Sequence, residues 1–296
     1  MSTPDRLAES SIEGCGPLDI RIMQTGDVAL ALDWAAAEGW NPGLSDAALF
    51  HAVDPGGFFV AVEEEAPVGV VSVVRYGADF AFLGFFMVRP DRRGRGIGRA
   101  LWRHALAERP AATVGLDGVV AQQEAYQRSG FVLAHRNIRY SGAAAVLDGP
   151  IAGVRPVAAG DFPVLAGLDT AAFGAARPAF LAGWLQAPGH AALVVEAEGG
   201  GLAGFGVLRP CRTGFKIAPL FADTPEAASR LLAALIARAG IGAVVMIDVP
   251  EPNVAARTLA ETAGLSPVFE TARMYRGPAP QLPLDRIFGL TSFELG

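Results

Sequence analysis

Residues 80–101 read FAFLGFFMVRPDRRGRGIGRAL, and this stretch decides the fold. Its first nine residues, Phe80–Val88, form a nearly unbroken apolar run, which is typical of a strand buried on both faces. Arg89 and Pro90 end the run, glycines then alternate with arginines, and a helical pattern begins at Arg99. Glycines at such a junction let successive backbone N–H groups point into one concavity, and the helix N-terminus adds positive partial charge. The stretch therefore predicts a phosphate-binding loop between a buried strand and a helix.

The charge distribution indicates one local anion site in an acidic protein. The 296-residue chain has 24 basic and 30 acidic residues and a formal net charge of −6, which argues against a nucleic-acid or membrane surface. Within residues 89–103, however, six arginines accompany a single acid, Asp91. We therefore expect one anionic ligand to bind there. The alternative is a flexible glycine turn whose arginines form a solvated face.

Composition and length favour a soluble protein of two domains. Hydrophobic residues make up 51% of the chain and charged residues 18%, which excludes a disordered chain, and 296 residues suit two domains. No apolar run reaches the ~18 residues of a membrane-spanning helix, and the N-terminus, MSTPDRLAES, has no apolar signal-peptide core. Cys15 and Cys211 lie far apart, and the four histidines show no metal-ligand spacing. We expect a cytoplasmic protein without a metal site and with a flexible N-terminus over residues 1–18.

An internal repeat divides the chain. IRIMQTGDV (residues 20–28) is echoed by VRPVAAGDF (residues 154–162) at an offset of 134 positions. The same offset joins further pairs: Arg21 and Arg155, Arg75 and Arg209, Gly130 and Gly264, and Arg139 and Arg273. Chance similarity in an alanine- and glycine-rich chain is the alternative, but a constant offset across both halves favours duplication. Linker composition places the boundary within residues 141–150, between halves at 19–141 and 151–296.

Hydrophobic patterning predicts one order of elements, β-α-α-β-β-β-α-β-α-β, in each half. In the first half the predicted strands are residues 19–23, 58–62, 68–75, 80–88, 113–119 and 131–140, and the predicted helices are residues 27–38, 46–51, 99–108 and 122–129. The second half reads alike up to a strand at residues 268–275 and then adds the tail LPLDRIFGLTSFELG.

The glycine–arginine loop resembles the acetyl-CoA signature of the GCN5-related N-acetyltransferases, the GNAT superfamily. Residues 93–98, RGRGIG, match the pattern (Gln/Arg)-x-x-Gly-x-(Gly/Ala) between the fourth strand and the third helix, and the element order agrees over residues 19–141. The resemblance implies an α/β (α+β) fold in which each half is a mixed, mostly antiparallel twisted sheet flanked by helices. It also implies acetyl-CoA as co-substrate, with the loop on the pyrophosphate and the strand backbone paired to the pantetheine arm. The implied contacts are Phe86, Met87, Val88, Arg93, Gly94, Arg95, Gly96, Ile97, Gly98 and Arg99.

Tyr126 resembles the tyrosine of the family's Tyr-x-x-x-Gly-Phe motif, here residues 126–131. When an amine attacks the thioester, the CoA sulfur leaves as a thiolate of pKa ~8.5, and a phenol of pKa ~10 beside it can donate a proton or hydrogen bond. We expect Tyr126 to be the general acid; packing of its ring under the last strand is the alternative. The family often has Asn and Ala seven and four residues earlier, where this chain has Val119 and Gln122.

The general base is less evident. An amine must be neutral to attack, so the site needs a proton acceptor, and the nearest acids by element are Asp117, near the end of the fifth strand, and Asp79, at the start of the fourth. Asp117 is our candidate. The alternatives are that both are ordinary surface or turn acids and that a water chain carries the proton.

The second half lacks the phosphate loop. Residues 216–227, KIAPLFADTPEA, replace the glycines and arginines, and Thr224 or Asp223 is expected to cap a helix there. Acids at this helix start would repel a pyrophosphate. The half keeps the family's Asn-x-x-Ala-x-x-Leu at Asn253, but Ala260 replaces the tyrosine. The whole chain resembles a tandem GNAT protein with a degenerate C-terminal GNAT-like domain.

The resemblance implies an acetyl-CoA-dependent N-acetyltransferase that acts on a small amine or an exposed amino group by direct attack. The alternative is a non-catalytic acyl-CoA-binding or ligand-sensing protein. We expect a monomer with an internal pseudo-dimer, or a weak homodimer, and no nucleic-acid or membrane partner. Residues 151–296 are expected either to form one wall of the acceptor pocket or only to stabilise the first half, with Phe288 and Phe293 of the tail packed on the sheet.

Overall fold

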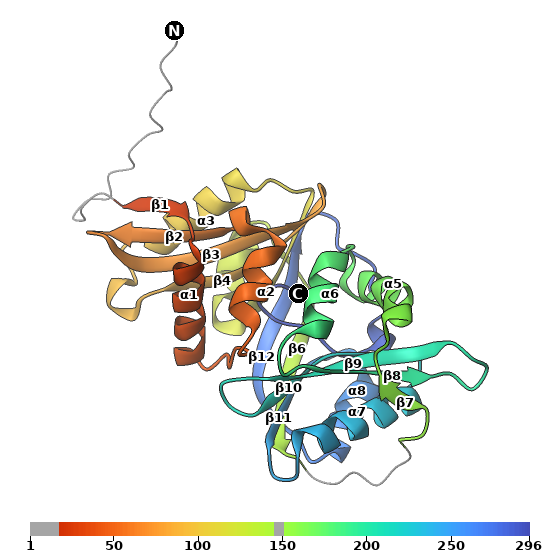
Figure 1. Cartoon of the computed structure of the whole chain (residues 1–296). Helices are drawn as coiled ribbons and strands as arrows, with labels where there is room; N and C mark the ends of the chain where they lie inside the picture. The colour runs from red at the N-terminus through yellow and green to blue at the C-terminus, as the bar shows by residue number, and fades with distance from the viewer. Residues whose placement is uncertain (1–17, 145–150) are drawn as a thin grey trace.

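The computed structural model describes residues 18–144 and 151–296 (Figure 1). The predicted flexible N-terminus lies, up to residue 17, outside these ranges, as do residues 145–150 of the predicted linker. The strands are β1 Asp19–Ile22, β2 Phe58–Glu63, β3 Ala66–Tyr76, β4 Phe80–Val88, β5 Thr113–Val119, β6 Val132–Ala143, β7 Val154–Pro156, β8 Ala191–Glu196, β9 Leu202–Pro210, β10 Phe215–Ala222, β11 Val244–Pro250, β12 Ser266–Arg276 and β13 Ile287–Gly289. The helices are α1 Thr25–Ala37, α2 Asp46–Val53, α3 Ile97–Glu108, α4 Gln123–Arg128, α5 Phe162–Phe173, α6 Pro178–Gln186, α7 Pro225–Ala239 and α8 Val254–Thr262.

The order of elements in the first half is confirmed. The predicted strands at residues 80–88 and 113–119 match β4 and β5 at both ends. Helix α3 begins at Ile97, two residues before the predicted start, because the left-handed Gly96 (φ 84°) is its N-cap. Helix α4 is shorter than predicted, since residues 120–122 form a separate 3₁₀ turn before it.

The strands join in one mixed sheet with the order β1-β2-β3-β4-β5-β12-β6-β11-β10-β9-β8-β7, and β13 pairs with β10. Among the strand pairs of the described residues, β4–β5 and β10–β11 are parallel and the others antiparallel. The predicted α/β fold with mixed, mostly antiparallel strands is therefore confirmed.

The two halves exchange their last strands. Strand β12, from the second half, lies between β5 and β6 of the first, and β6 lies between β12 and β11 (Figure 1). The repeat in the sequence divides the chain near residues 141–150, but the sheet is continuous across that division. Each half therefore completes its fifth strand with the sixth strand of the other.

Two buried ion pairs join the exchanged strands. Arg139 on β6 binds Asp248 on β11 through two hydrogen bonds of 2.6 and 2.8 Å. Arg273 on β12 binds Asp117 on β5 in the same way, at 2.6 and 2.8 Å. Bidentate Arg–carboxylate pairs fix geometry as well as charge. One of the repeated arginine pairs seen in the sequence, Arg139 and Arg273, thus makes matching contacts of the two halves across the exchange.

Apolar side chains fill both faces of the sheet. In β3, Val70 and Val74 pack with α1 and α2 on one face, while Val71 and Val73 pack with α3 on the other. Alternate residues of a strand point to opposite faces, so a strand covered on both sides is apolar throughout. In the second half, α7 covers one face and α5 and α6 the other.

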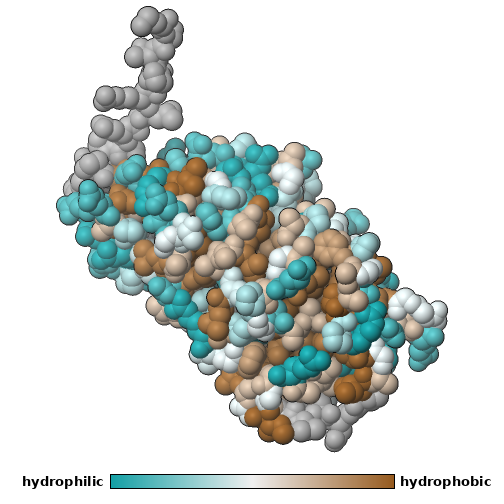
Figure 2. Space-filling model, in the orientation of Figure 1, coloured by the Kyte–Doolittle hydropathy of each residue, from teal (hydrophilic) through white to brown (hydrophobic). Residues whose placement is uncertain are grey.

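The surface carries both apolar and polar residues. On the face shown in Figure 2, apolar residues lie in small groups between polar ones. No helix among the described residues is both long and apolar enough to cross a membrane.

Candidate active site

A bulge in β4 opens the sheet. The register between β3 and β4 shifts between Val70 and Ser72, and Phe85 on β4 has a φ of 48°. Positive φ is costly for a bulky residue and is held by its surroundings. β4 pairs with β5 over Phe80–Leu83, before the bulge. Beyond it, the two parallel strands line the walls of a cavity instead of bonding to each other.

The glycine–arginine loop borders a groove of about 600 Å³ at the mouth of this opening. Its lining residues come from the end of α1, β4, the loop, α3, the end of β5 and the segment that leads into α4. They are Glu38, Trp40, Phe86, Met87, Val88, Arg92, Arg93, Gly94, Gly96, Ile97, Gly98, Arg99, Val119, Gln122 and Tyr126. All predicted contacts except Arg95 are among them. Arg95 instead approaches the buried Glu63, with 3.7 Å between Nη1 and Oε2.

Glycine is required at several places in the loop. Gly94 and Gly96 have φ values of 78° and 84°, a region that other residues rarely adopt. A Cβ on Gly98 would lie 3.2 Å from the Phe86 ring, so the glycine lets α3 begin close to β4. The helix N-terminus is thereby held against the end of the strand, where a pyrophosphate would meet its free N–H groups. The residues present fit the CoA diphosphate.

The loop arginines are held by neighbouring oxygen atoms. Arg93 donates to the Val88 carbonyl at 2.9 Å and pairs with Glu38 at the end of α1. Arg92 lies 3.4 Å from Glu63. The sequence did not point to Glu38, Trp40 or Arg92 as groove residues. Arg92 belongs to the same charge cluster, but the other two come from a helix end about fifty residues earlier and carry no motif.

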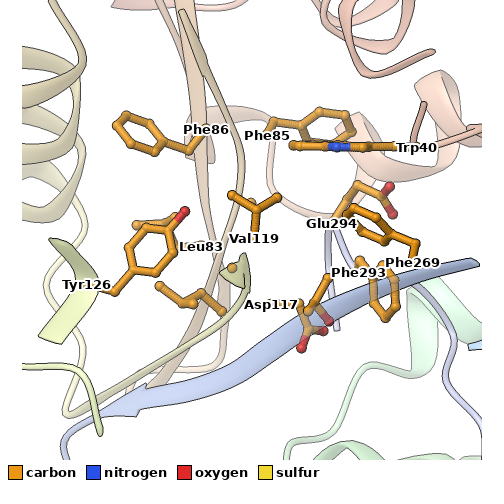
Figure 3. Close-up of a pocket in the computed structure, with 14 residues that line it drawn as sticks. Trp40, Leu83, Phe85, Phe86, Asp117, Val119, Tyr126, Phe269, Phe293 and Glu294 are labelled. Atoms are coloured by element: carbon orange, nitrogen blue, oxygen red, sulfur yellow. The ribbon is translucent and has the colours of Figure 1, made fainter. Parts of the chain in front are cut away.

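A second, inner pocket continues from the groove (Figure 3). Its enclosed volume is about 50 Å³, and its first-half wall comes from β4, β5 and α4. The second half contributes Phe269 and Thr271 from β12, and Phe293 and Glu294 from the C-terminal tail. The exchanged strand and the tail therefore form one wall of this pocket.

Tyr126 lines both the groove and the inner pocket. Its ring stacks on Trp102, with 5.6 Å between ring centroids and 21° between planes, and lies directly over Gly118, where a Cβ would collide with it. Figure 3 shows its hydroxyl directed into the pocket. Burial raises the pKa of Tyr126 to about 12, so the phenol keeps its proton at physiological pH. The ring is packed, as the alternative expected, yet its hydroxyl group faces the cavity.

Asp117 also lines the inner pocket, but both of its oxygen atoms are engaged. Oδ1 accepts hydrogen bonds from Asn137 at 2.7 Å and from Arg273 at 2.8 Å, and Oδ2 accepts one from Arg273 at 2.6 Å. Both oxygen atoms already serve as acceptors, although burial, opposed by the Arg273 guanidinium, raises the pKa of Asp117. Asp79 is exposed at the opposite end of β4, away from the pocket. The geometry thus favours a structural role for Asp117.

The corresponding opening of the second half is filled by the chain itself. β10 carries a bulge at the same place as β4, between Ile217 and Leu220, and pairs with β11 over Phe215–Ile217. Beyond the bulge, the tail strand β13 pairs with β10, with Leu220 opposite Gly289. In the first half, the equivalent edge of β4 borders the groove. An extended ligand can pair with a sheet edge in the same way, as an added strand.

Family residues kept in the second half hold this tail. Asn253 caps α8 by accepting from Ala256 N, and its amide donates to the carbonyls of Leu284 and Ile287, each at 3.0 Å. Thr224 caps α7, as predicted. Ala260, in the place of the tyrosine, is buried in the core.

No group of three or more His, Cys, Asp or Glu side chains within residues 18–144 and 151–296 is arranged to hold a metal.

Comparisons with known proteins bear on both halves. Two family profiles, each described as an acetyltransferase (GNAT) domain, match residues 54–133 and residues 165–289. The holothin acyltransferase of Pseudoalteromonas sp. (strain SANK 73390) is 32% identical over 265 residues, covering 89% of this chain and 90% of that protein.

Solved structures share the fold over nearly the whole chain. A putative acetyltransferase from Pyrococcus horikoshii superposes with a TM-score of 0.80 at 25% identity, covering 94% of this chain and 96% of that one. A tandem GNAT protein from the clavulanic acid biosynthesis pathway has a TM-score of 0.62 at 16% identity, covering 88% of this chain and 99% of that one. Together with the phosphate loop and the duplicated sheet, these similarities show that the chain belongs to the GNAT family of acyltransferases, as a tandem GNAT protein.

Proposed function

We propose that the protein transfers an acetyl group from acetyl-CoA to a primary amine by direct attack. One observation carries this proposal: the groove and the inner pocket meet, and Phe86 and Tyr126 line both cavities at their junction. A CoA molecule extended from the glycine–arginine loop along β4 would bring its thioester to this junction. The amine would then approach from the inner pocket.

The size of the inner pocket supports a short acyl group. A water molecule needs about 10–15 Å³ of such volume, so about 50 Å³ suits a group of a few heavy atoms, such as acetyl. The walls near the junction are the bulky side chains of Leu83, Phe85 and Leu116. A long acyl chain would have to displace them.

The roles of the first-half residues follow from this arrangement. Backbone N–H groups beside the β4 bulge would stabilise the developing oxyanion, and the Tyr126 phenol would protonate the leaving thiolate. Donors fixed before reaction are effective because they need no reorganisation. Phe86, Met87 and Val88 would pair with the pantetheine arm, as expected.

The acceptor is proposed to be a small amine or an exposed amino group. Because one relative is named as a holothin acyltransferase, holothin is the first acceptor to test. We further propose that the chain works as a monomer, since its two halves already pair within one sheet. Light scattering after size-exclusion chromatography tests this; a stable dimer would contradict it.

The test of function is release of free CoA thiol from acetyl-CoA in the presence of a panel of amines, with the acylated product identified by mass spectrometry. Propionyl-, butyryl- and hexanoyl-CoA are the matched comparisons. We expect acceptor-dependent thiol release that falls as the acyl chain lengthens. Release independent of every amine, or faster transfer of hexanoyl than acetyl groups, would contradict the proposal.

A further inference from the structure

The C-terminal tail passes from the filled opening of the second half into the inner pocket of the first. Its end is fixed by three contacts. Arg177, buried beneath it, donates to Thr291 Oγ1 at 2.8 Å and to the Gly296 carbonyl at 2.9 Å. Tyr76, on β3, donates to the Leu295 carbonyl at 3.0 Å. The tail is therefore held on both sides of Glu294.

The backbone of Glu294 packs directly on β4. A Cβ on Gly84, the residue before the bulge, would collide with the Glu294 carbonyl oxygen, so glycine is needed there. The Ser292 hydroxyl accepts hydrogen bonds from the N–H groups of Glu294 and Leu295, at 3.1 and 2.9 Å. These contacts place the Glu294 side chain in the wall of the inner pocket.

Glu294 is a buried acid that forms no salt bridge within residues 18–144 and 151–296. It is 2% exposed, and its Oε2 atom has no hydrogen-bond partner among the described residues. The other buried acids in these ranges form ion pairs: Asp46 with Arg209, Asp117 with Arg273, Asp169 with Arg177, Asp248 with Arg139, and Glu63 with Arg92 and Arg95. A buried polar atom left unpaired destabilises the fold, and more so when it is charged. Such an atom in a pocket wall points to a ligand.

The electrostatic neighbours of this carboxyl group are basic side chains. Three buried cations on neighbouring strands, Arg139, Arg209 and Lys216, interact electrostatically with it. Arg139 and Arg209 already form ion pairs with Asp248 and Asp46, whereas Lys216 forms no ion pair within residues 18–144 and 151–296. Thr271, also in the pocket wall, has an unpartnered hydroxyl that offers a second polar contact.

We propose that Glu294 binds the amino group of the acceptor and takes its proton. The inference rests on the proposed function, since it assigns the base for that reaction. In Figure 3, Glu294 and Tyr126 lie on opposite sides of the pocket, which suits a base for the amine and an acid for the thiolate. As the proposed base, Glu294 takes the place of Asp117, because both oxygen atoms of Asp117 are held by other side chains.

The proton and bond changes balance. The Glu294 carboxylate takes one proton from the ammonium group, and the neutral amine attacks the thioester carbonyl carbon. The C–N bond forms, the C–S bond breaks, and the thiolate takes the Tyr126 proton. The second proton of the attacking nitrogen restores the phenol, and Glu294 later gives its proton to water. The products are the amide, CoA thiol and one released proton.

The test replaces the carboxylate with its uncharged isostere, Glu294→Gln. We expect kcat/KM for the amine to fall roughly 100-fold, as for other lost acid–base groups, while the Kd of acetyl-CoA from calorimetry stays unchanged. The matched control is Asp285→Asn, the same chemical change at an exposed position of the same tail, which should keep full activity. Activity of Glu294→Gln within threefold of the unaltered protein would overturn the inference, and so would weakened acetyl-CoA binding, which would assign the residue to packing.

A second measurement separates proton transfer from simple binding. An alkyl amine substrate and its fluorinated, weakly basic counterpart differ in how much they need a base, because the fluorinated amine is already neutral at pH 7. We expect the defect of Glu294→Gln to be at least tenfold smaller with the fluorinated amine. An equal defect with both amines would remove the proton-transfer role. If the unaltered protein transfers acetyl to no amine at all, the proposed function fails, whatever Glu294 does.

Discussion

The two halves of this protein contain the same opening and use it differently. In both, a bulge separates the fourth strand from the fifth, β4 from β5 and β10 from β11. In the first half, the opening continues into a groove lined by the glycine–arginine loop. In the second, β13 is paired along the equivalent strand edge. The comparison teaches that the same strand edge can either border an open groove or be covered by the protein's own tail.

The second half, which lacks the glycine–arginine loop, has an anchored C-terminal tail instead. Asn253 and the bulged strand, which the duplication supplied, now anchor a segment that ends in the other half's pocket. The degenerate half is tied to the competent one through that tail and through the exchanged β12. Four substitutions break or sharpen this comparison, in order of decreasing effect.

Gly96→Glu should abolish acetyl-CoA binding. The substitution puts a side chain on a residue with φ 84° and an anion where the pyrophosphate would lie. Calorimetry on the unaltered protein should give one site per chain, because the second opening is occupied. Two sites per chain would break the comparison between the halves.

Gly240→Glu is the matched control for Gly96→Glu. Gly240 has a φ of 88°, follows a helix of the second half, and has open space around its Cβ position. The variant also places an acidic side chain on a residue of positive φ, but far from the groove, so acetyl-CoA affinity should not change. Equal losses in both variants would indicate destabilisation rather than a lost phosphate site.

Tyr126→Phe should lower kcat roughly 10²-fold with little change in acetyl-CoA affinity, because the ring stack on Trp102 survives and the proton donor does not. The measurement is steady-state kinetics with calorimetry beside it. Equal loss of rate and affinity, or no loss, would assign the tyrosine to packing. Since Ala260 stands in its place in the second half, this variant makes the first half resemble the second in its lack of an acid.

Asn253→Ala should loosen the tail. It removes a helix cap and two hydrogen bonds to tail carbonyls, and we expect the free energy of unfolding to fall by about 3 kcal/mol in urea titrations. Thr224→Ala, which removes a cap in the same half without touching the tail, should cost about 1 kcal/mol. KM for the amine should rise in the first variant alone. If KM rises in neither variant, the Asn253 contacts with the tail do not affect the acceptor pocket.

Lys216→Met should alter the pH dependence of stability. Burial lowers the pKa of Lys216 from its ordinary 10.5 to about 8. Between these values the unfolded chain keeps a proton that the folded protein has lost, so stability rises with pH through this window. Relative to Lys216→Met, the unaltered protein should gain about 2 kcal/mol between pH 7.5 and 9.5 in urea titrations. A parallel pH dependence in both proteins would show that Lys216 titrates normally.

Local patterns in the sequence were enough to predict the elements of the first half and the loop that borders the groove. The apolar run of β4, its abrupt end and the glycine spacing are properties of adjacent residues, and they predicted the groove contacts apart from Arg95. Arg95 is a long side chain beside several others, and which of them meets Glu63 depends on the packing of β2.

Long-range pairing could not be predicted in this way. The arginine repeat at residues 139 and 273 was visible, but a repeat does not tell which half each strand joins. For the same reason Asp117 was expected as a free base, because its partner Arg273 lies on the exchanged strand. Glu294 carried no signal in a tail of mixed composition. The close approach of its backbone to β4 requires the glycine at position 84, which reads as an ordinary glycine in a strand.

The strand exchange also sets an order of events during synthesis. While the first half emerges from the ribosome, β5 has no partner on its open side, since β12 spans residues 266–276 near the end of the chain. An unpaired strand edge is a site for wrong association, and contacts of such long sequence separation slow folding. The nascent first half is thus expected to need protection until almost the whole chain is made. Conversely, two separately made fragments, cut between β6 and β7, should recover their fold only when mixed.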